Sequence, residues 1–190
     1  MQTPRLMAVL AHPDDESLGI GGTLAKYASE GADVFLLTAT RGDDGRYRGY
    51  RPGDPQHPGS SALANIREAE LRAAASALCV REVSLLDYHD GHLDRANPRE
   101  VITTIVQHLR RVRPDVVITF GPDGAYGHPD HIAISQFTTA AIVAAAFAGF
   151  PDQRSNTAHP HGRTPVRAKA KQRIGPAIVN GRAVGESNRT

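Results

Sequence analysis

The residues LMAVLAHPDDE (6–16) place three consecutive carboxylates directly after an apolar run of strand length. Like charges this close raise one another's proton affinity, so a helix N-terminus, an arginine or a bound cation must offset their repulsion. The apolar run is short and does not alternate with polar residues, which is typical of a strand covered on both faces. The stretch therefore predicts a buried strand with a polar site at its carboxyl end.

Three further apolar runs resemble the first, and helical patterns lie between them. Strands are expected at 6–11, 32–39, 81–88 and 115–121, and helices at 17–31, 62–78, 98–114 and about 130–148. This alternation predicts an α/β fold, a Rossmann-like three-layer sandwich with a mostly parallel sheet. In such sheets ligands bind beyond the carboxyl ends of the strands, where strand order reverses, so the active site is expected there.

The character of the chain changes near residue 151. Residues 151–190 lose hydrophobic periodicity and hold eight basic side chains against two acidic ones, whereas the first 150 residues hold 14 basic and 18 acidic ones. We expect a catalytic domain at 1–150 and a basic tail of low regularity at 151–190, with a hairpin at 174–184 as a weak pattern. The sequence pI of 8.9 belongs to this tail, so no nucleic-acid partner is expected.

The cellular setting is constrained by one cysteine and one long apolar stretch. Cys79 is the only cysteine, which excludes an internal disulfide, fits a reducing compartment and suggests a small buried side chain. Residues 132–150 are long enough to span a membrane, but they include polar side chains and are mostly alanine, so a buried helix is expected. These features predict a cytoplasmic, soluble chain without a membrane partner, and they leave homo-oligomer formation open.

A second polar cluster, GPDGAYGHPDH (121–131), follows the fourth expected strand. If the strand order is 3-2-1-4, the first and fourth strands are neighbours and the two clusters face each other. His12, Asp15 and His131 would then supply three ligands of the kinds that catalytic zinc sites use. A divalent cation there would offset the carboxylate repulsion and lower the pKa of bound water toward about 7.

These motifs have two other interpretations. HPDDE alone also fits a proline-initiated helix start whose acids complement the helix dipole, but two such clusters, each opening a helix after a strand, favour a functional site. The stretch LGIGGTLA (18–25) superficially suggests a dinucleotide-binding loop, yet Leu24 occupies the position of the third glycine and the preceding acids would repel a pyrophosphate. These glycines are better explained by close helix–sheet packing.

The two clusters also carry a family resemblance. HPDDE (12–16), GAYGHPDH (124–131), the R-x-x-E-L signature starting at Arg67 and DGHL (90–93) resemble the LmbE/PIG-L-type family of zinc-dependent N-deacetylases. The resemblance covers roughly residues 5–150. It implies a Rossmann-like fold, a small-molecule amino-sugar substrate and the removal of an acetyl group from an N-acetylglucosaminyl compound.

The resemblance implies a metal centre and a base. His12, Asp15 and His131 would bind Zn²⁺, with Fe²⁺ as an alternative metal. Asp14 would be the general base that takes a proton from the metal-activated water as it attacks the amide carbonyl.

The remaining roles also follow from the resemblance. Tyr126 or protonated His128 would stabilise the tetrahedral oxyanion, and His128 would donate a proton to the departing amine. Asp130 would orient His128 and keep it charged. Arg67 and Asp90 match positions that the family uses to bind the sugar.

The sequence leaves the substrate open. Another small-molecule amidase on the same scaffold is an alternative, because pocket walls rather than metal ligands choose the substrate. Residues 151–190 lack the strand-rich continuation usual in the family, so a metal-binding but catalytically impaired member is a second alternative. The polar segment 42–61 is too long and too rich in glycine and proline for a regular element, and it is a candidate lid.

Overall fold

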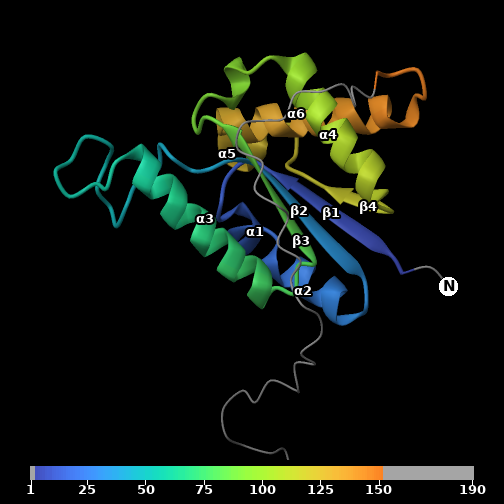
Figure 1. Cartoon of the computed structure of the whole chain (residues 1–190), viewed down its shortest axis with the longest axis horizontal. Helices are drawn as coiled ribbons and strands as arrows, with labels where there is room; N and C mark the ends of the chain where they lie inside the picture. Colours follow the sequence, from blue (N-terminus) through green and yellow to red (C-terminus); the bar gives the residue numbers. More distant parts are fainter. Residues whose placement is uncertain (1–2, 152–190) are drawn as a thin grey trace, which may run out of the picture.

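The computed structural model describes residues 3–151, so the expected tail and its hairpin lie outside the described residues. Its centre is a four-stranded parallel sheet with the order β3-β2-β1-β4 (Figure 1). The strands are β1 (Arg5–Leu10), β2 (Asp33–Thr40), β3 (Glu82–Tyr88) and β4 (Val116–Ile118). The expected order is confirmed, and β1 and β4 are neighbours at the reversal of strand order.

Helices connect the strands and continue the chain beyond β4. They are α1 (Asp15–Leu18), α2 (Gly21–Ser29), α3 (Ser60–Ala77), the 3-10 turn η1 (Leu93–Arg95), α4 (Pro98–Val112), α5 (Gly124–Gly127) and α6 (Pro129–Ala146). The single helix expected at 17–31 is wrong, because the chain breaks at Gly19 and Ile20 between α1 and α2. The break brings Gly21 so close to α1 that a Cβ there would lie 3.2 Å from the Glu16 carbonyl oxygen.

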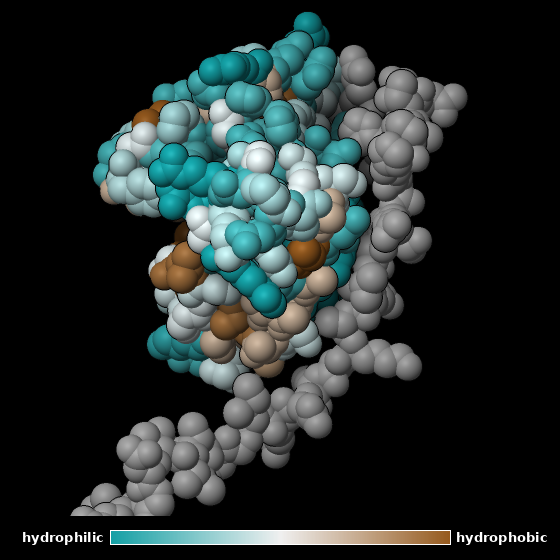
Figure 2. All heavy atoms as spheres, turned by 90° about the vertical axis from the view of Figure 1, so that its left-hand side faces the viewer, coloured by the Kyte–Doolittle hydropathy of each residue, from teal (hydrophilic) through white to brown (hydrophobic). Residues whose placement is uncertain are grey.

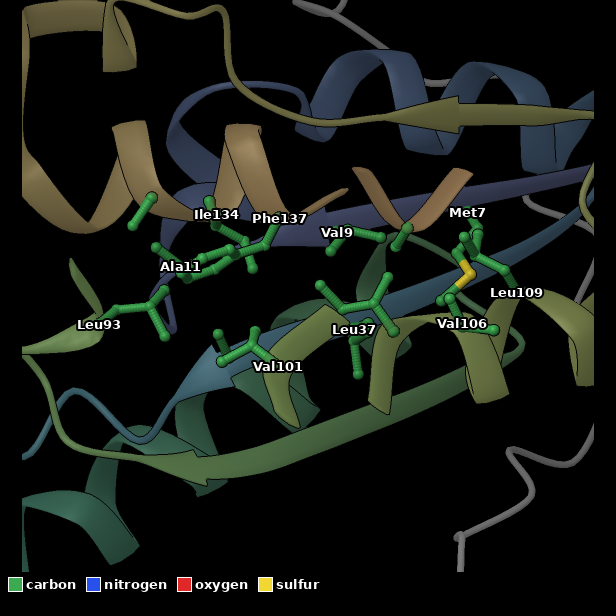
Figure 3. Packing of buried hydrophobic residues seen from close by; sticks show 14 of the residues in the cluster. Met7, Val9, Ala11, Leu37, Leu93, Val101, Val106, Leu109, Ile134 and Phe137 are labelled. Atoms are coloured by element: carbon green, nitrogen blue, oxygen red, sulfur yellow. The ribbon is translucent and has the colours of Figure 1, made fainter. Parts of the chain in front are cut away.

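The sheet is covered on both faces, which confirms the three-layer sandwich. Alternate residues of β1 point to opposite faces, as the strand period of two requires. Met7 and Val9 belong to the core that includes residues of α4 and α6, where Figure 3 shows them beside Val106 and Phe137. The alternate residues of β1 belong to a second core with residues of α2 and α3: Leu6, Ala8 and Leu10 from β1, with Leu24 and Leu71. Each fully buried leucine, valine or methionine side chain in these cores stabilises the fold by about 1.5–3 kcal/mol.

The fourth strand is shorter than its apolar sequence suggests. Of the expected 115–121, only Val116–Ile118 pair with β1. The chain then leaves the sheet, and Phe120 stacks on the ring of His131 with a centroid separation of 3.9 Å. The residues that the prediction assigned to the strand end therefore help to build the site.

Two expectations about burial need correction. The buried residues of α6 end at Ala141, and Val143 is 71% exposed, so only the first part of this helix is buried. Cys79 is exposed and adopts a positive φ of 57° in the turn that follows α3. Within residues 3–151, no helix has the length and apolar character needed to cross a membrane.

The segment 42–61 is irregular up to the start of α3, as expected, and contains one tight turn. Tyr47 and Tyr50 exchange backbone hydrogen bonds of 3.0 and 2.9 Å. Arg48 and Gly49 between them both have positive φ values, 51° and 91°, the pattern of a two-residue hairpin turn. In Figure 1 this segment projects beyond the N-terminal end of α3.

Candidate metal centre and active site

The turn after β1 fixes the carboxylate of Asp15. Its Oδ2 atom accepts hydrogen bonds from the backbone N–H groups of Ala11 at 3.2 Å and His12 at 2.8 Å. Its Oδ1 atom lies 3.4 Å from Nε2 of His131, which enters from the first turn of α6. The Asp15 side chain therefore spans the gap between the two sequence clusters.

His131 is oriented by contacts on two sides. Its Nδ1 atom lies 3.3 Å from the carbonyl oxygen of Gly124, which can only accept, so Nδ1 carries the proton and Nε2 is left free as a ligand. Phe120 stacks on the ring. Gly124 has a φ of +63°, and a Cβ there would lie 2.8 Å from Cγ1 of Ile132, so only glycine fits. Neither Phe120 nor Gly124 was identified as a site residue from the sequence, although Gly124 belongs to the recognised motif.

Atoms of three side chains converge at separations that suit a tetrahedral metal ion, with the Asp15 carboxylate facing His12 through Oδ2 and His131 through Oδ1. Nδ1 of His12 lies 3.2 Å from Nε2 of His131 and 3.7 Å from Oδ2 of Asp15. Ligands held at 2.0–2.1 Å around a tetrahedral zinc are about 3.4 Å apart, so the observed separations fit. Two imidazoles and one carboxylate are also a ligand set of catalytic zinc sites, and the three residues form one of two groups able to hold a metal among the described residues.

The other nitrogen of His12 is held by two carboxylates. Nε2 lies 3.0 Å from Oδ2 of Asp130 and 3.0 Å from Oδ1 of Asp90. Asp130 is fully buried and also accepts hydrogen bonds from the N–H groups of Gly91 at 2.8 Å and Leu93 at 3.0 Å. Burial lowers the pKa of His12, but these hydrogen bonds outweigh it and raise the pKa to about 10. The carboxylates of Asp130 and Asp90 therefore favour a positive charge at the position of His12.

The contacts of the Asp130 carboxylate differ from the role expected for it. The carboxylate of Asp130 contacts His12, whereas His128 accepts a 3.2 Å hydrogen bond on Nδ1 from the backbone N–H of Asp130. Asp90 is 9% exposed and faces His12, and its sugar-binding role stays a prediction. His12 rather than His128 is thus the imidazole that Asp130 orients.

His128 and Tyr126 lie on the solvent side of the cluster. The ring of His128 stacks on that of His131 at 4.7 Å. Desolvation and the nearby His12 and His131 lower the pKa of His128, which differs from the protonated state expected from the resemblance. Tyr126 is 76% exposed with its ring 5.2 Å from that of His131, and desolvation with the charges of Asp15 and Asp14 raises the pKa of its phenol. Tyr126 therefore keeps its proton and can donate a hydrogen bond.

Asp14 is held in an unusual backbone conformation. Its φ of 124° and ψ of −25° lie in a region of backbone conformation that residues other than glycine rarely adopt. Its N–H donates to Oε2 of Glu16 at 3.0 Å, and the 1% exposed Glu16 also accepts a 2.6 Å hydrogen bond from the Ser17 hydroxyl. The Asp14 carboxylate lies 2.5 Å from Nη2 of Arg67. Arg67, expected to bind sugar, is therefore brought directly against the expected base.

The chain belongs to the PIG-L family. The family model described as "PIG-L: GlcNAc-PI de-N-acetylase" matches residues 7–142, which include both polar clusters.

Individual relatives agree with this assignment. A 1D-myo-inositol 2-acetamido-2-deoxy-alpha-D-glucopyranoside deacetylase of Rhodococcus erythropolis is 44% identical over 164 residues, covering 78% of this chain and 56% of its own length. N,N'-diacetylchitobiose deacetylase from Pyrococcus horikoshii, in complex with an inhibitor, superimposes with a TM-score of 0.68 at 28% identity, covering 78% of this chain and 53% of its own. The conserved protein TT1542 from Thermus thermophilus superimposes with a TM-score of 0.62 at 35% identity, and the match covers 77% of this chain and 58% of TT1542. The chain thus spans a little over half the length of these relatives.

Proposed function

We propose that this chain is the catalytic domain of a zinc-dependent hydrolase that removes an acetyl group from an N-acetylglucosaminyl small molecule. The observation that carries the proposal is the convergence of His12, Asp15 and His131 beside Asp14 at the carboxyl ends of β1 and β4. The activities named for the relatives support the same reaction and substrate class. We further propose that residues 1–150 form this domain, that 151–190 form a separate tail, and that the enzyme acts in the cytoplasm.

In this proposal His12, Asp15 and His131 would hold Zn²⁺, or Fe²⁺ as the alternative. When bound, the metal would supply Lewis-acid chemistry and lower the pKa of water in the site toward about 7. Asp14 takes the proton from the attacking water, and its 2.5 Å contact with Arg67 restrains the position of the carboxylate.

The solvent-side residues serve the second half of the reaction. Tyr126, as a protonated phenol, donates a hydrogen bond to the oxyanion that forms from the amide carbonyl. His128 passes a proton to the departing amine, and its lowered pKa makes it a good donor once protonated. Asp130 and Asp90 hold the ring of His12 through Nε2, so that Nδ1 stays directed toward Asp15 and His131.

The proposal is tested by measuring free-amine release from a panel of N-acetylglucosaminyl conjugates and, in the same preparations, bound zinc. Wild type should bind one zinc and release amine, and His131→Ala should lose both. His108→Gln, which changes a histidine on α4 outside the metal site, is the matched control and should retain both. Release only from other acetylated amides would favour the broader amidase, and zinc binding without any release would favour the impaired member of the family.

A further inference from the structure

The side chain of Glu16 is a buried carboxyl group that none of the catalytic roles described above uses. Charged side chains usually lie at the surface of a protein, and the face of this molecule shown in Figure 2 is mostly hydrophilic. Glu16 is instead only 1% exposed. Across residues 3–151, no ion pair includes Glu16, so hydrogen bonds alone offset the cost of burying it. The role of Glu16 therefore follows from the groups that these hydrogen bonds hold.

Both oxygens of Glu16 are hydrogen bonded within the turn that opens α1. Oε2 accepts from the backbone N–H of Asp14 at 3.0 Å, and Oε1 accepts from the hydroxyl of Ser17 at 2.6 Å. A glutamate that reaches back to the N–H of a helix N-cap forms half of a capping box, here from the second helical position instead of the third. Asp14 is this N-cap residue, and its own side chain does not cap the helix. The Asp14 carboxylate is therefore not used to begin α1.

The two peptide groups that flank the Cα atom of Asp14 are both held by α1. The N–H group binds Glu16, and the carbonyl oxygen accepts the N–H groups of Ser17 and Leu18, each at 2.9 Å. Because φ and ψ are the rotations that relate these two peptide groups, holding both groups restrains both angles. The carbonyl contacts accompany any helix that begins here, whereas the hold on the N–H depends on one side chain. Glu16 therefore stabilises the φ of 124° that Asp14 adopts.

The backbone conformation of Asp14 determines where its carboxylate lies. The carboxyl carbon is only two bonds from Cα, so a change in φ that turns the Cα–Cβ bond also moves the carboxylate. In the structure this carboxylate contacts Arg67. Asp14 also directly precedes Asp15, a proposed metal ligand, so a change in its backbone would shift the carboxylate relative to the metal centre.

We propose that Glu16 is a positioning residue for the reaction, which holds the backbone N–H of Asp14 and thereby keeps the Asp14 carboxylate in the place from which it takes the proton of the attacking water. The inference rests on the proposed function, in which Asp14 is the base, and extends it to the residue that places this base. Within the described part of the chain, the Glu16 side chain forms hydrogen bonds with Asp14 and Ser17 and with none of the proposed metal ligands. Its replacement should therefore leave zinc binding intact.

The test removes the acceptor while keeping a side chain of similar size. Glu16→Leu has no acceptor, whereas Glu16→Gln keeps an amide oxygen that can accept from Asp14. Bound zinc, kcat per bound zinc and KM are measured with an N-acetylglucosaminyl conjugate. We expect Glu16→Leu to bind one zinc and to lose about 10- to 100-fold in kcat, because a misplacement of about 1 Å can cost a factor of about 100. KM should stay within about twofold, since the base acts in the transition state, and Glu16→Gln should keep kcat within about threefold.

Two further variants separate positioning from folding. Glu82→Leu makes the same change at the amino end of β3, where the glutamate binds Arg111 at the opposite end of the sheet from the metal centre. It should leave kcat per bound zinc and KM unchanged. Ser17→Ala, at an exposed position, removes the second hydrogen bond of Glu16 and should lower kcat by about threefold. Ser17→Ala carries the kinetic test if Glu16→Leu does not fold.

A second readout needs no catalysis. Asp14→Gly and Asp14→Ala are compared by urea unfolding in the presence of a chelator, each with and without Glu16→Leu. If Glu16 holds position 14 at positive φ, its loss lets the alanine variant relax to an ordinary φ, whereas glycine has little strain to lose. The stability advantage of glycine over alanine at this position should therefore shrink to less than half when Glu16→Leu is added.

Several results would overturn the proposal. They are a kcat of Glu16→Leu within about twofold of wild type, an equal loss of kcat in Glu82→Leu, a loss of bound zinc in Glu16→Leu, or an undiminished advantage of glycine over alanine at position 14. Failure of the proposed function gives a different result, because zinc-loaded wild type itself would then release no amine.

Discussion

The unusual backbone conformation of Asp14 predicts an effect on stability that can be measured separately from any effect on catalysis. At φ 124° and ψ −25° the residue occupies a conformation that glycine adopts freely and alanine does not. We therefore compare Asp14→Gly with Asp14→Ala. Both variants lose the carboxylate, the contact to Arg67 and the repulsion from neighbouring acids, so the difference between them reports the backbone alone.

The expected magnitude follows from two opposing terms. Strained backbone of this kind costs about 1–3 kcal/mol, which Asp14→Gly relieves and Asp14→Ala retains. Glycine loses about 0.5–1 kcal/mol more than alanine through the entropy of the unfolded chain. Asp14→Gly should therefore be more stable than Asp14→Ala by about 1 kcal/mol, which corresponds to a Tm higher by about 2–4 °C for a chain of this size.

The assay is urea unfolding of both variants in the presence of a chelator, so that metal binding does not contribute. Gln107, on the exposed face of α4, provides the matched pair at an ordinary helical φ, where the glycine variant should be less stable than the alanine variant by about 1 kcal/mol. The opposite sign at the two positions is the diagnostic result. If Asp14→Ala is as stable as Asp14→Gly, Asp14 is not strained and the reasoning fails.

Three further predictions concern burial, pH and metal. Asp130→Ala leaves the N–H groups of Gly91 and Leu93 without their buried acceptor. It should therefore lower the free energy of unfolding by about 2–5 kcal/mol. A loss below about 1 kcal/mol in urea unfolding would contradict these two hydrogen bonds. Burial and Arg111 lower the pKa of His108 from 6.5 to about 4, so the unfolded chain binds a proton that the folded chain does not. Stability should therefore fall as pH drops from about 6.5 toward 4, and His108→Gln should flatten that fall in urea titrations at several pH values; an unchanged slope would argue against a neutral His108 imidazole in the folded chain. Zinc at about 100 times its Kd should raise the free energy of unfolding by about 2.7 kcal/mol, and a shift that survives in His131→Ala would place the metal elsewhere.

The sequence was sufficient to predict the fold and the proximity of the two polar clusters, HPDDE (12–16) and GPDGAYGHPDH (121–131). Alternating strand and helix patterns predict a parallel sheet, and the positions of HPDDE and HPDH after the first and fourth strands predict the convergence of His12 with His131. The end of β4 could not be predicted, because the run at 115–121 has no break in its pattern, whereas Phe120 makes tertiary contacts outside the sheet: its ring stacks on His131 and its carbonyl oxygen accepts a hydrogen bond from Ser135.

Side-chain partners inside the motifs required the structure. Asp130 lies in the first turn of α6 and turns toward the segment at Gly91 and Leu93, which comes from a distant part of the chain, so adjacency to His128 gives no guide to its contact. The positive φ of Asp14 was equally out of reach, because sequence rules assign such conformations to glycine. The contact of Asp130 and the φ of Asp14 both belong to the site, where tertiary contacts outweigh local conformational preferences.

In the proposed mechanism Asp14 acts as the base beside a metal held by His12, Asp15 and His131. The most direct measurement determines bound zinc and amine release from an N-acetylglucosaminyl conjugate on the same samples of wild type and Asp14→Ala. We expect one zinc in both proteins and release in wild type alone. Release by Asp14→Ala at the wild-type rate, or a zinc-loaded wild type that releases no amine, would contradict it.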